Sequence, residues 1–433
     1  MPVTVQAVPG TYATTGDYKL TTLKLYSGDK SKFLDIKPQM TDMTIFEDIF
    51  KTSLYGRIGI IDSIGLLTGR VSGFPLIGEE WLEVEFYVPG RDKIHLWFRV
   101  FGLTDLMPDE KQSSTLFALD FCSEEHFYDA NTLIQKAYKA PISDIVNDVV
   151  VNYLKSTKPL YIDPTDGPQD LIVPNLSPFD AIEFMRKRAV SLKFLSNTYL
   201  YYENKQGIFF STVEELVKAA GDKKDNPTYK YTFDPQVADN NPLPLTSLKN
   251  IVALKFATNF DTISAMKHGY FSNRTLVLSP LTQSWQTKDF GVSEVPLDQF
   301  KTLNGKPLFS QAFIEANKQK RFELCYVIQD ANRPPVHDDI LYGPKCQYMT
   351  GLSQRVLTCR VPGDSCIHAG DVIFLDINEW HGFTPKQDVR DKLRSSAYLI
   401  GTIKHSFDTK NYFMTMDLYT DSFPNTVESV TMQ

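Results

Sequence analysis

Four cysteine and histidine residues near the C-terminus are the best candidates for a metal site in this sequence. Cys359, Cys366, His368 and His381 follow the spacing C-x6-C-x-H-x12-H. Thiolate and imidazole groups bind zinc, but structural zinc sites use close pairs such as C-x2-C, which this spacing lacks. Buried cysteines and surface histidines on a β module explain the pattern better, so we expect no metal site.

Acidic residues form the next candidate group, because a pair of carboxylates across a cleft can hydrolyse a glycosidic bond. Glu79 and Glu80 are followed by Glu83 and Glu85. Glu83 and Glu85 alternate with apolar residues, which is the pattern of a strand with one polar and one buried face. We interpret them as residues of a surface that faces solvent or a channel, and we expect no catalytic residues here.

The motifs of nucleophilic catalysis and phosphate binding are absent. The sequence contains no G-x-S-x-G elbow, no H-E-x-x-H motif and no G-x-x-x-x-G-K-[ST] loop. Residues 65–70 resemble a phosphate loop only loosely and lack its Lys-Ser/Thr pair. We therefore expect neither an enzyme nor a cofactor-binding protein. A catalytic set assembled from distant Ser, Cys, His and Asp residues stays an alternative that one sequence does not decide.

A pattern of three strands occurs twice, far apart in the chain. The first copy starts at Gly78-Glu79-Glu80 and the second at Gly370-Asp371. The patterns predict strands over residues 82–88, 94–101 and 115–121 in the first copy, and over 372–377, 397–405 and 412–419 in the second. Both third strands contain an apolar-Asp-apolar step, at Asp120 and at Asp417. Unless two β meanders are alike by chance, a few such chains could form a ring with twice as many near-equivalent units.

Length and composition limit the class of protein. The 433 residues, with 29 Phe and 21 Tyr, predict a folded, sheet-rich protein of about two to four domains. The net charge of −7 argues against general or sequence-specific nucleic-acid binding, which needs a basic face. Neither a signal peptide nor an apolar stretch of about 20 residues is visible, so we expect a chain made in a cytoplasm that does not insert into a membrane.

Helical patterns interrupt the strands. Apolar residues spaced three and four apart between 142 and 153 predict an amphipathic helix. Ser177 as N-cap and Pro178 as the first helical residue predict the start of a second helix. Residues 261–341 show no clear period, and we expect an irregular insertion with one helical stretch. Strands are predicted again from Tyr348 to residue 421.

Several stretches together resemble the baseplate central hub protein of contractile-tailed bacteriophages of the T-even type. Their order and spacing agree over roughly residues 20–420. The stretches are 53–57 (SLYGR), 58–63 (IGIIDS), 176–182 (LSPFDAI), 201–204 (YYEN), 360–363 (RVPG), 370–373 (GDVI), 398–401 (YLIG) and 403–407 (IKHSF). A related module begins the type VI secretion spike proteins of the valine-glycine repeat family.

The resemblance implies a fold that is α+β and mainly β. It implies two similar tube-type β-barrel domains, the second split by an insertion, and two peripheral α/β domains. Residues 1–121 would form the first barrel domain, and 226–262 with 342–433 the second. The peripheral domains would be a helix-containing domain over 122–225 and an inserted domain over 263–341.

The resemblance also implies a function and partners. Three copies would form a ring with pseudo-sixfold symmetry that adapts the hexameric tail tube to a trimeric spike and leaves a channel for DNA ejection. The expected partners are further copies of this chain, a separate spike protein with an OB-fold, a tail-tube or tube-initiator protein, and baseplate wedge proteins. The expected location is the tail baseplate of the virion, after assembly in the cytoplasm of the host bacterium.

Channel-facing positions and two other functions complete the predictions. We expect Glu83, Glu85 and Asp417, on polar strand faces, to face the channel. One alternative is a tail-associated cell-wall hydrolase, although no distinctive carboxylate pair is visible. The other is a host-surface or carbohydrate-binding module that uses the aromatic-rich stretch at 378–383.

Overall fold

The fold is described from a computed structural model of the chain. It describes residues 16–425 except 68, 70–72, 109–113, 195, 234–248, 259, 280–282, 292–301, 318–321, 328–337 and 379–389.

One large sheet runs through the molecule. Its strands follow the order β14-β19-β22-β21-β3-β4-β7-β6-β5-β1-β2, and β13 joins through β20, which also pairs with β21. The first β unit holds the strands β1 (Lys19–Tyr26), β2 (Phe33–Asp35), β3 (Met40–Asp48), β4 (Tyr55–Asp62), β5 (Trp81–Tyr87), β6 (Ile94–Pro108) and β7 (Thr115–Cys122), with the short helix η1 (Lys37–Gln39).

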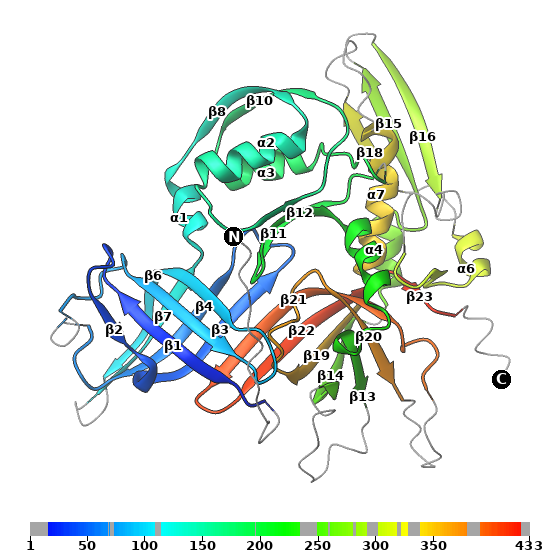
Figure 1. The fold of residues 1–433 in the computed structure, drawn as a ribbon. Coiled ribbons are helices and arrows are strands. Elements are labelled where there is room, and N and C mark those ends of the chain that lie inside the picture. Colours follow the sequence, from blue (N-terminus) through cyan, green and yellow to red (C-terminus); the bar gives the residue numbers. More distant parts are fainter. Residues whose placement is uncertain are drawn as a thin grey trace.

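The second β unit is assembled from distant parts of the chain. It holds β13 (Lys230–Phe233), β14 (Ala253–Thr258), β19 (Arg355–Pro362), β20 (Val372–Ile377), β21 (Ala397–Asp408) and β22 (Tyr412–Thr420), with η3 (Pro227–Tyr229) before β13. The two β units lie side by side in the lower part of Figure 1. Their buried apolar residues form one continuous core, so the units are packed against each other and not merely linked.

The first peripheral unit lies above the two β units in Figure 1, with α4 over the second of them. It consists of α1 (Glu124–Asn131), β8 (Ile134–Ala140), α2 (Ile142–Asp148), η2 (Val149–Tyr153), β9 (Leu160–Ile162), β10 (Gln169–Leu176), α3 (Pro178–Arg186), β11 (Tyr199–Asn204), β12 (Gly207–Thr212) and α4 (Val213–Lys223). A separate apolar core holds α2, η2 and α3 against the strands of this unit. Both predicted helices are confirmed, and the Ser177 hydroxyl caps α3 by accepting a hydrogen bond from the N–H of Asp180.

The second peripheral unit corrects the expectation of an irregular insertion. It holds α5 (Thr262–Lys267), β15 (Ser272–Ser279), β16 (Ser284–Gly291), β17 (Lys306–Pro307), α6 (Gln311–Ala316), β18 (Phe322–Val327) and α7 (Asp338–Leu352). β16, β15 and β18 form a sheet of their own, and β17 pairs with the short strand β23 (Ser422–Phe423). Because α7 extends to Leu352, the expected return to strands at Tyr348 is wrong, and strands resume at Arg355.

The predicted fold class, α+β and mainly β, is confirmed. All six strands of the predicted repeat are present, and β6 and β21 extend beyond their predicted ends to Pro108 and Asp408. Within the described part of the chain, no helix has the length and apolar composition needed to cross a bilayer.

Candidate functional site

The two β units repeat one order of neighbouring strands. In the first unit the order is β5-β6-β7-β4-β3, and in the second it is β20-β21-β22-β19-β14. The strands therefore correspond one to one, β6 to β21 and β3 to β14 in particular. The repeat expected from the sequence is thus also a repeat of strand connectivity.

The register of the pairs gives the correspondence residue by residue. A bulge follows Val100 in β6, after which Gly102 faces Asp120, and a bulge follows Ile400 in β21, after which Thr402 faces Asp417. Asp120 and Asp417 are thus equivalent, as the apolar-Asp-apolar step predicted.

The beginning of the repeat differs by one residue from the sequence match. The N–H of Val100 donates to the carbonyl of Glu80, and the N–H of the equivalent Ile400 donates to the carbonyl of Asp371. Glu80 is therefore equivalent to Asp371. Gly78 then corresponds to Ala369, the residue before Gly370, and not to Gly370 itself. Each of the two carboxylates accepts a hydrogen bond from the N–H three residues earlier in the chain, which secures the turn before the strand.

A seam of paired strands joins the two units. β3 runs antiparallel to the outer half of β21, with seven facing pairs from Asp48–Thr402 to Asp42–Asp408 and no irregularity. The inner half of β21 pairs along the same edge with β20. A ladder between the two units fixes their relative position more firmly than side-chain contacts alone, because it satisfies backbone donors and acceptors on both sides.

A buried ion pair lies on this seam. The turn between β11 and β12 places the Lys205 ammonium 3.0 Å from Glu47 Oε1, with both side chains fully buried. Glu47 Oε1 also lies 3.0 Å from His405 Nε2, and His405 Nδ1 lies 2.7 Å from the Tyr412 hydroxyl. Glu47 Oε2 accepts the N–H of Ala369. The first peripheral unit thus inserts a cation between the two β units.

The electrostatics of this cluster follow from burial and from the Lys205 charge. Burial lowers the pKa of His405 to about 4, and the nearby ammonium adds to this effect. Burial alone would raise the pKa of Glu47, but Lys205 and His405 hold it far below its usual range. The arrangement therefore consists of a carboxylate, an ammonium and a neutral imidazole that donates to the carboxylate.

Two further ion clusters connect the units. Glu203 at the end of β11 accepts the N–H of Leu54 and, together with Glu125, holds the Lys158 ammonium at 2.6 Å. On the other side, Arg91 of the β5–β6 turn pairs at 2.9 Å with Asp364 in the loop between β19 and β20.

Asp364 is nearly buried and also pairs with Lys249 at 2.9 Å. Burial would raise its pKa, but the two cations lower it. Because the β5–β6 turn and the β19–β20 loop belong to different β units, this ion cluster is a second connection between them.

The predicted channel-facing residues all lie on strand faces opposite the core. Glu83 accepts from the Tyr26 hydroxyl at 2.8 Å and contacts His95 Nε2 at 2.9 Å. Glu85 pairs with Lys93 at 2.6 Å. Asp417 accepts hydrogen bonds from two threonine hydroxyls, on β19 and β21, whereas its equivalent Asp120 forms an ion pair with arginine. The structure thus does not bring the three carboxylates together into one site.

The candidate metal ligands do not converge either. Among the described residues, no group of three or more His, Cys, Asp or Glu side chains has the arrangement of a metal site. Burial raises the pKa of the Cys359 and Cys366 thiols, which disfavours the thiolate that zinc requires. His381, the fourth candidate, lies outside the described residues, as do residues 379–383 of the aromatic-rich stretch.

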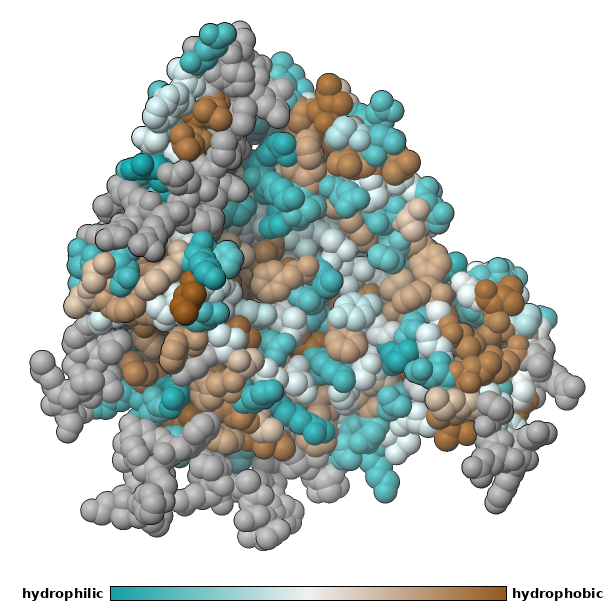
Figure 2. Space-filling view, turned by 180° about the vertical axis from the view of Figure 1, so that it is seen from behind, coloured by the Kyte–Doolittle hydropathy of each residue, from teal (hydrophilic) through white to brown (hydrophobic). Residues whose placement is uncertain are grey.

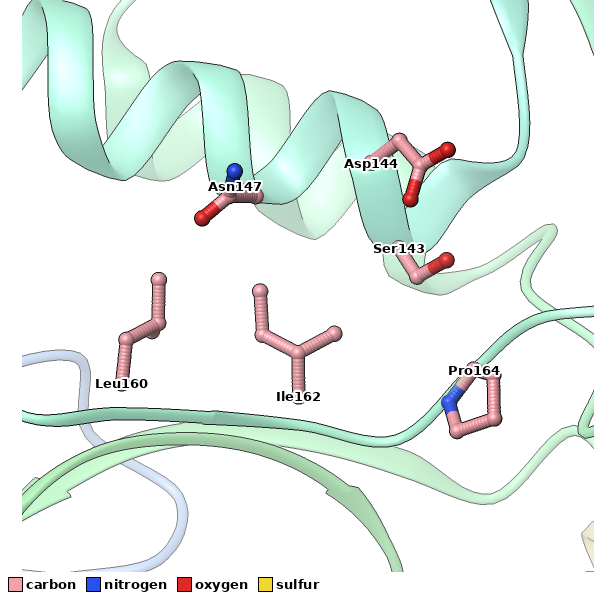
Figure 3. Close-up of a pocket in the computed structure, with 6 residues that line it drawn as sticks. All are labelled: Ser143, Asp144, Asn147, Leu160, Ile162 and Pro164. Atoms are coloured by element: carbon pink, nitrogen blue, oxygen red, sulfur yellow. The ribbon is translucent and has the colours of Figure 1, made fainter.

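An open cleft of about 350 Å³ lies in the first peripheral unit. Figure 3 shows polar side chains of α2 on one side and apolar side chains from the β9 segment on the other; the lining residues are Ser143, Asp144, Asn147, Leu160, Ile162 and Pro164. Asp144 is the single carboxylate among them. A glycosidase needs a second carboxylate across the cleft, so this cleft does not favour the hydrolase alternative.

Sequence reasoning missed the buried ion cluster. Nothing in the local sequence marks Lys205, in the turn between β11 and β12, as buried. Glu47 and His405 each give a weak signal, because each is a titratable residue at a core-facing position of an alternating strand. Such a residue is costly to bury unless it is paired, so this position could have been used as a signal.

Comparison with solved structures defines the class of fold. The tail protein from Neisseria meningitidis MC58 has a TM-score of 0.55, with 10% identity, over 94% of this chain and 98% of that chain. The 43 kDa tail protein of prophage MuSo2 from Shewanella oneidensis has a TM-score of 0.54, with 10% identity, over 93% and 98%. The fold is therefore that of these two tail proteins.

Comparison of sequences gives a more particular relative, although no family model matches the chain. The chain is 24% identical over 418 residues to a protein named "Probable baseplate hub protein gp334" from Vibrio phage KVP40, which covers 90% of this chain and 92% of that protein. The resemblance to phage baseplate hub proteins stated from the sequence is thereby confirmed.

Proposed function

We propose that this chain is a structural hub protein of a phage tail baseplate and a component of the virion. The similarity to the Vibrio phage protein along nearly the whole chain and the shared fold of phage tail proteins support the proposal. The role is structural and needs neither catalysis nor a cofactor, and the chain acts through its contacts with other tail proteins.

One observation supports a more detailed proposal about how copies of the chain assemble. Two β units with the same strand order lie side by side in one sheet, joined by the β3–β21 seam. We propose that three copies of the chain repeat this arrangement in a closed ring of six near-equivalent units. A closed ring removes the unpaired sheet edges, which would otherwise template aggregation.

Such a ring would match two symmetries. Six near-equivalent β units would present a surface for the hexameric tail tube, and three chains would present a surface for a trimeric spike. The proposed partners are a separate spike protein with an OB-fold, a tail-tube or tube-initiator protein, and baseplate wedge proteins. The peripheral units would surround the ring, and the channel would admit DNA at ejection.

We propose further that Glu83, Glu85 and Asp417 face this channel. All three lie on strand faces opposite the core. Carboxylates along the wall would repel DNA phosphates, so that DNA passes without binding, in keeping with the net charge of −7.

The assembly state of the purified chain tests the proposal. Sedimentation and native mass measurements are expected to give a trimer, and electron microscopy is expected to show a ring with an open centre. Addition of the spike protein encoded by the same phage should give a complex of three chains with three spike chains. A chain that stays monomeric at all concentrations and binds neither spike nor tube protein would overturn it.

A further inference from the structure

Among the strand edges of the large sheet that have no strand partner in the described part of the chain, two are related by the strand repeat. One is β14 at the end of the sheet. The other is the outer half of β6, beyond Val100, where β7 pairs on one side and β5 has already ended. Apolar residues are exposed at both edges, with Leu106 at 54%, Met107 at 59% and Phe260 at 69%. Figure 2 shows apolar residues gathered over the first β unit.

The strand repeat shows what these edges correspond to. β14 occupies in the second unit the place that β3 occupies in the first, and the outer half of β6 corresponds to the outer half of β21. Within the chain, β3 and the outer half of β21 are partners. The two free edges are therefore the equivalents of two strands that already pair with each other.

We propose that β14 of one copy pairs antiparallel with the outer half of β6 in the next copy. The seam between chains would then repeat the seam within each chain. The inference rests on the proposed ring and specifies which edges meet in it and in which register.

The register follows from the equivalences. Within the chain, Phe46 faces Lys404 and Thr44 faces Ser406. β4 and β19 correspond to each other through their pairing with β7 and β22. Their pairing with β3 and β14 then makes Thr258 the equivalent of Phe46, and Lys255 the equivalent of Thr44. They likewise make Thr104 and Met107 the equivalents of Lys404 and Ser406. The seam between chains is therefore expected to place Thr104 opposite Thr258 and Met107 opposite Lys255.

Two irregularities that look unrelated in the single chain fit this register. β6 carries one extra residue between Thr104 and Met107 relative to β21, and β14 carries one extra residue between Lys255 and Thr258 relative to β3. An extra residue in one strand alone would break a ladder at that point. Here both strands lengthen at the same place, so the ladder between them stays regular. Matched insertions of this kind are expected when two strands pair with each other.

The side chains at this register are compatible. Leu106 would face Phe256, an apolar pair, and Thr104 would face Thr258; facing pairs of both kinds stabilise antiparallel strands. Phe260 would lie across from Gly102, where no side chain obstructs the ring. In the seam within the chain, the facing pair equivalent to Leu106 and Phe256 is His405 and Ile45.

Disulfide trapping tests the register. Thr104→Cys with Thr258→Cys in one chain is expected to give, on oxidation, covalent species of two and three chains and none larger, because a closed ring ends at three. Each single variant and the unmodified chain, oxidised in parallel, should stay single on a denaturing gel. The pair Thr104→Cys with Lys255→Cys is offset by three residues and should not cross-link, because its Cα atoms are too far apart.

An edge-blocking variant gives an independent readout. Leu106→Glu changes a side chain that is exposed in the single chain, so the fold is expected to stay intact while the trimer is lost. Ile172→Glu, at an exposed apolar residue of β10, should leave the trimer unchanged.

The outcomes separate the two proposals. A native trimer that forms with Leu106→Glu, or that cross-links only through the offset pair, would overturn this seam and leave the ring standing. A strictly monomeric unmodified chain would overturn the ring itself.

Discussion

Glu47 and Lys205 lie 3.0 Å apart with both side chains completely buried, although they belong to different units of the fold. Glu47 lies on the strand that forms the seam, and Lys205 on the turn between β11 and β12. Removing both charges from water is costly, and only their mutual attraction and further hydrogen bonds offset that cost. We interpret the pair as a positional lock, which favours one arrangement of the three units over others.

Breaking this pair is expected to destabilise the protein strongly. Glu47→Gln leaves the Lys205 ammonium buried without a carboxylate, and the loss expected for such a change is about 3–5 kcal/mol in the free energy of unfolding. Denaturant unfolding of the unmodified chain and the variant measures it.

The matched control is the double variant Glu47→Met with Lys205→Met, which removes both charges and keeps similar volume. Because apolar replacements of a buried pair are often close to neutral, the double variant is expected to lose much less than Glu47→Gln. A double variant as unstable as the single one would show that packing, and not the unpaired charge, determines the loss.

The His405 imidazole predicts a dependence of stability on pH. Its pKa is lowered to about 4 in the folded protein, against a usual value near 6.5. Between these values the unfolded chain binds a proton that the folded chain does not, so the free energy of unfolding falls as the pH drops from about 6.5 to 4. Asp421, with its pKa raised to about 6 by burial, acts in the opposite direction in that window.

Comparison of variants therefore isolates the contribution of His405 to the pH dependence of stability. His405→Gln is expected to remove the loss of stability between pH 6.5 and 4 that His405 causes, while His126→Gln, at an exposed histidine, should leave the profile of the unmodified chain unchanged. The measurement is the unfolding midpoint in denaturant across that pH range. If the His405→Gln profile runs parallel to that of the unmodified chain, the imidazole does not cause the pH dependence.

The strands of the repeat were predicted from the sequence more accurately than the strands of the inserted unit. Alternating apolar residues marked β5, β20 and β22 to within one residue at each end, because one face of each strand packs on the core. β16 was missed because five of its eight residues are polar and most of them are exposed, so its sequence shows no alternation. A strand that is mostly exposed and has one strand partner leaves little trace in hydropathy.

The candidate site was less predictable for a different reason. Lys205, Glu47 and His405 come from three distant parts of the chain, and each is ordinary in its local pattern. Burial arises only when the β11–β12 turn meets the β3–β21 seam. The matched extra residues in β6 and β14 are also invisible without the pairing register, because a single extra residue in a strand does not disturb composition.

Reversal of the proposed channel charge is expected to make the ring bind DNA. Asp417→Lys together with Glu83→Lys and Glu85→Lys would place cations where the wall is proposed to be acidic, and each phosphate contact releases counterions. Fluorescence anisotropy with duplex DNA should show salt-dependent binding for this variant and none for the unmodified ring. The isosteric set Glu83→Gln, Glu85→Gln and Asp417→Asn should bind weakly or not at all. Equal binding by the Lys and the Gln/Asn sets would contradict a channel position.

A glycine next to the seam provides the last prediction. A Cβ atom on Gly363 would lie 1.9 Å from Cδ1 of Tyr412, and this ring is fixed because its hydroxyl contacts His405 Nδ1. Gly363→Ala is therefore expected to lower the free energy of unfolding by about 1–3 kcal/mol or more through overpacking. Gly221→Ala, in α4 with no neighbour within 4 Å of the added atom, should instead stabilise by roughly 0.5–1 kcal/mol. If Gly363→Ala is as stable as the unmodified chain, the Tyr412 ring moves freely and the seam is less rigid than its hydrogen bonds indicate.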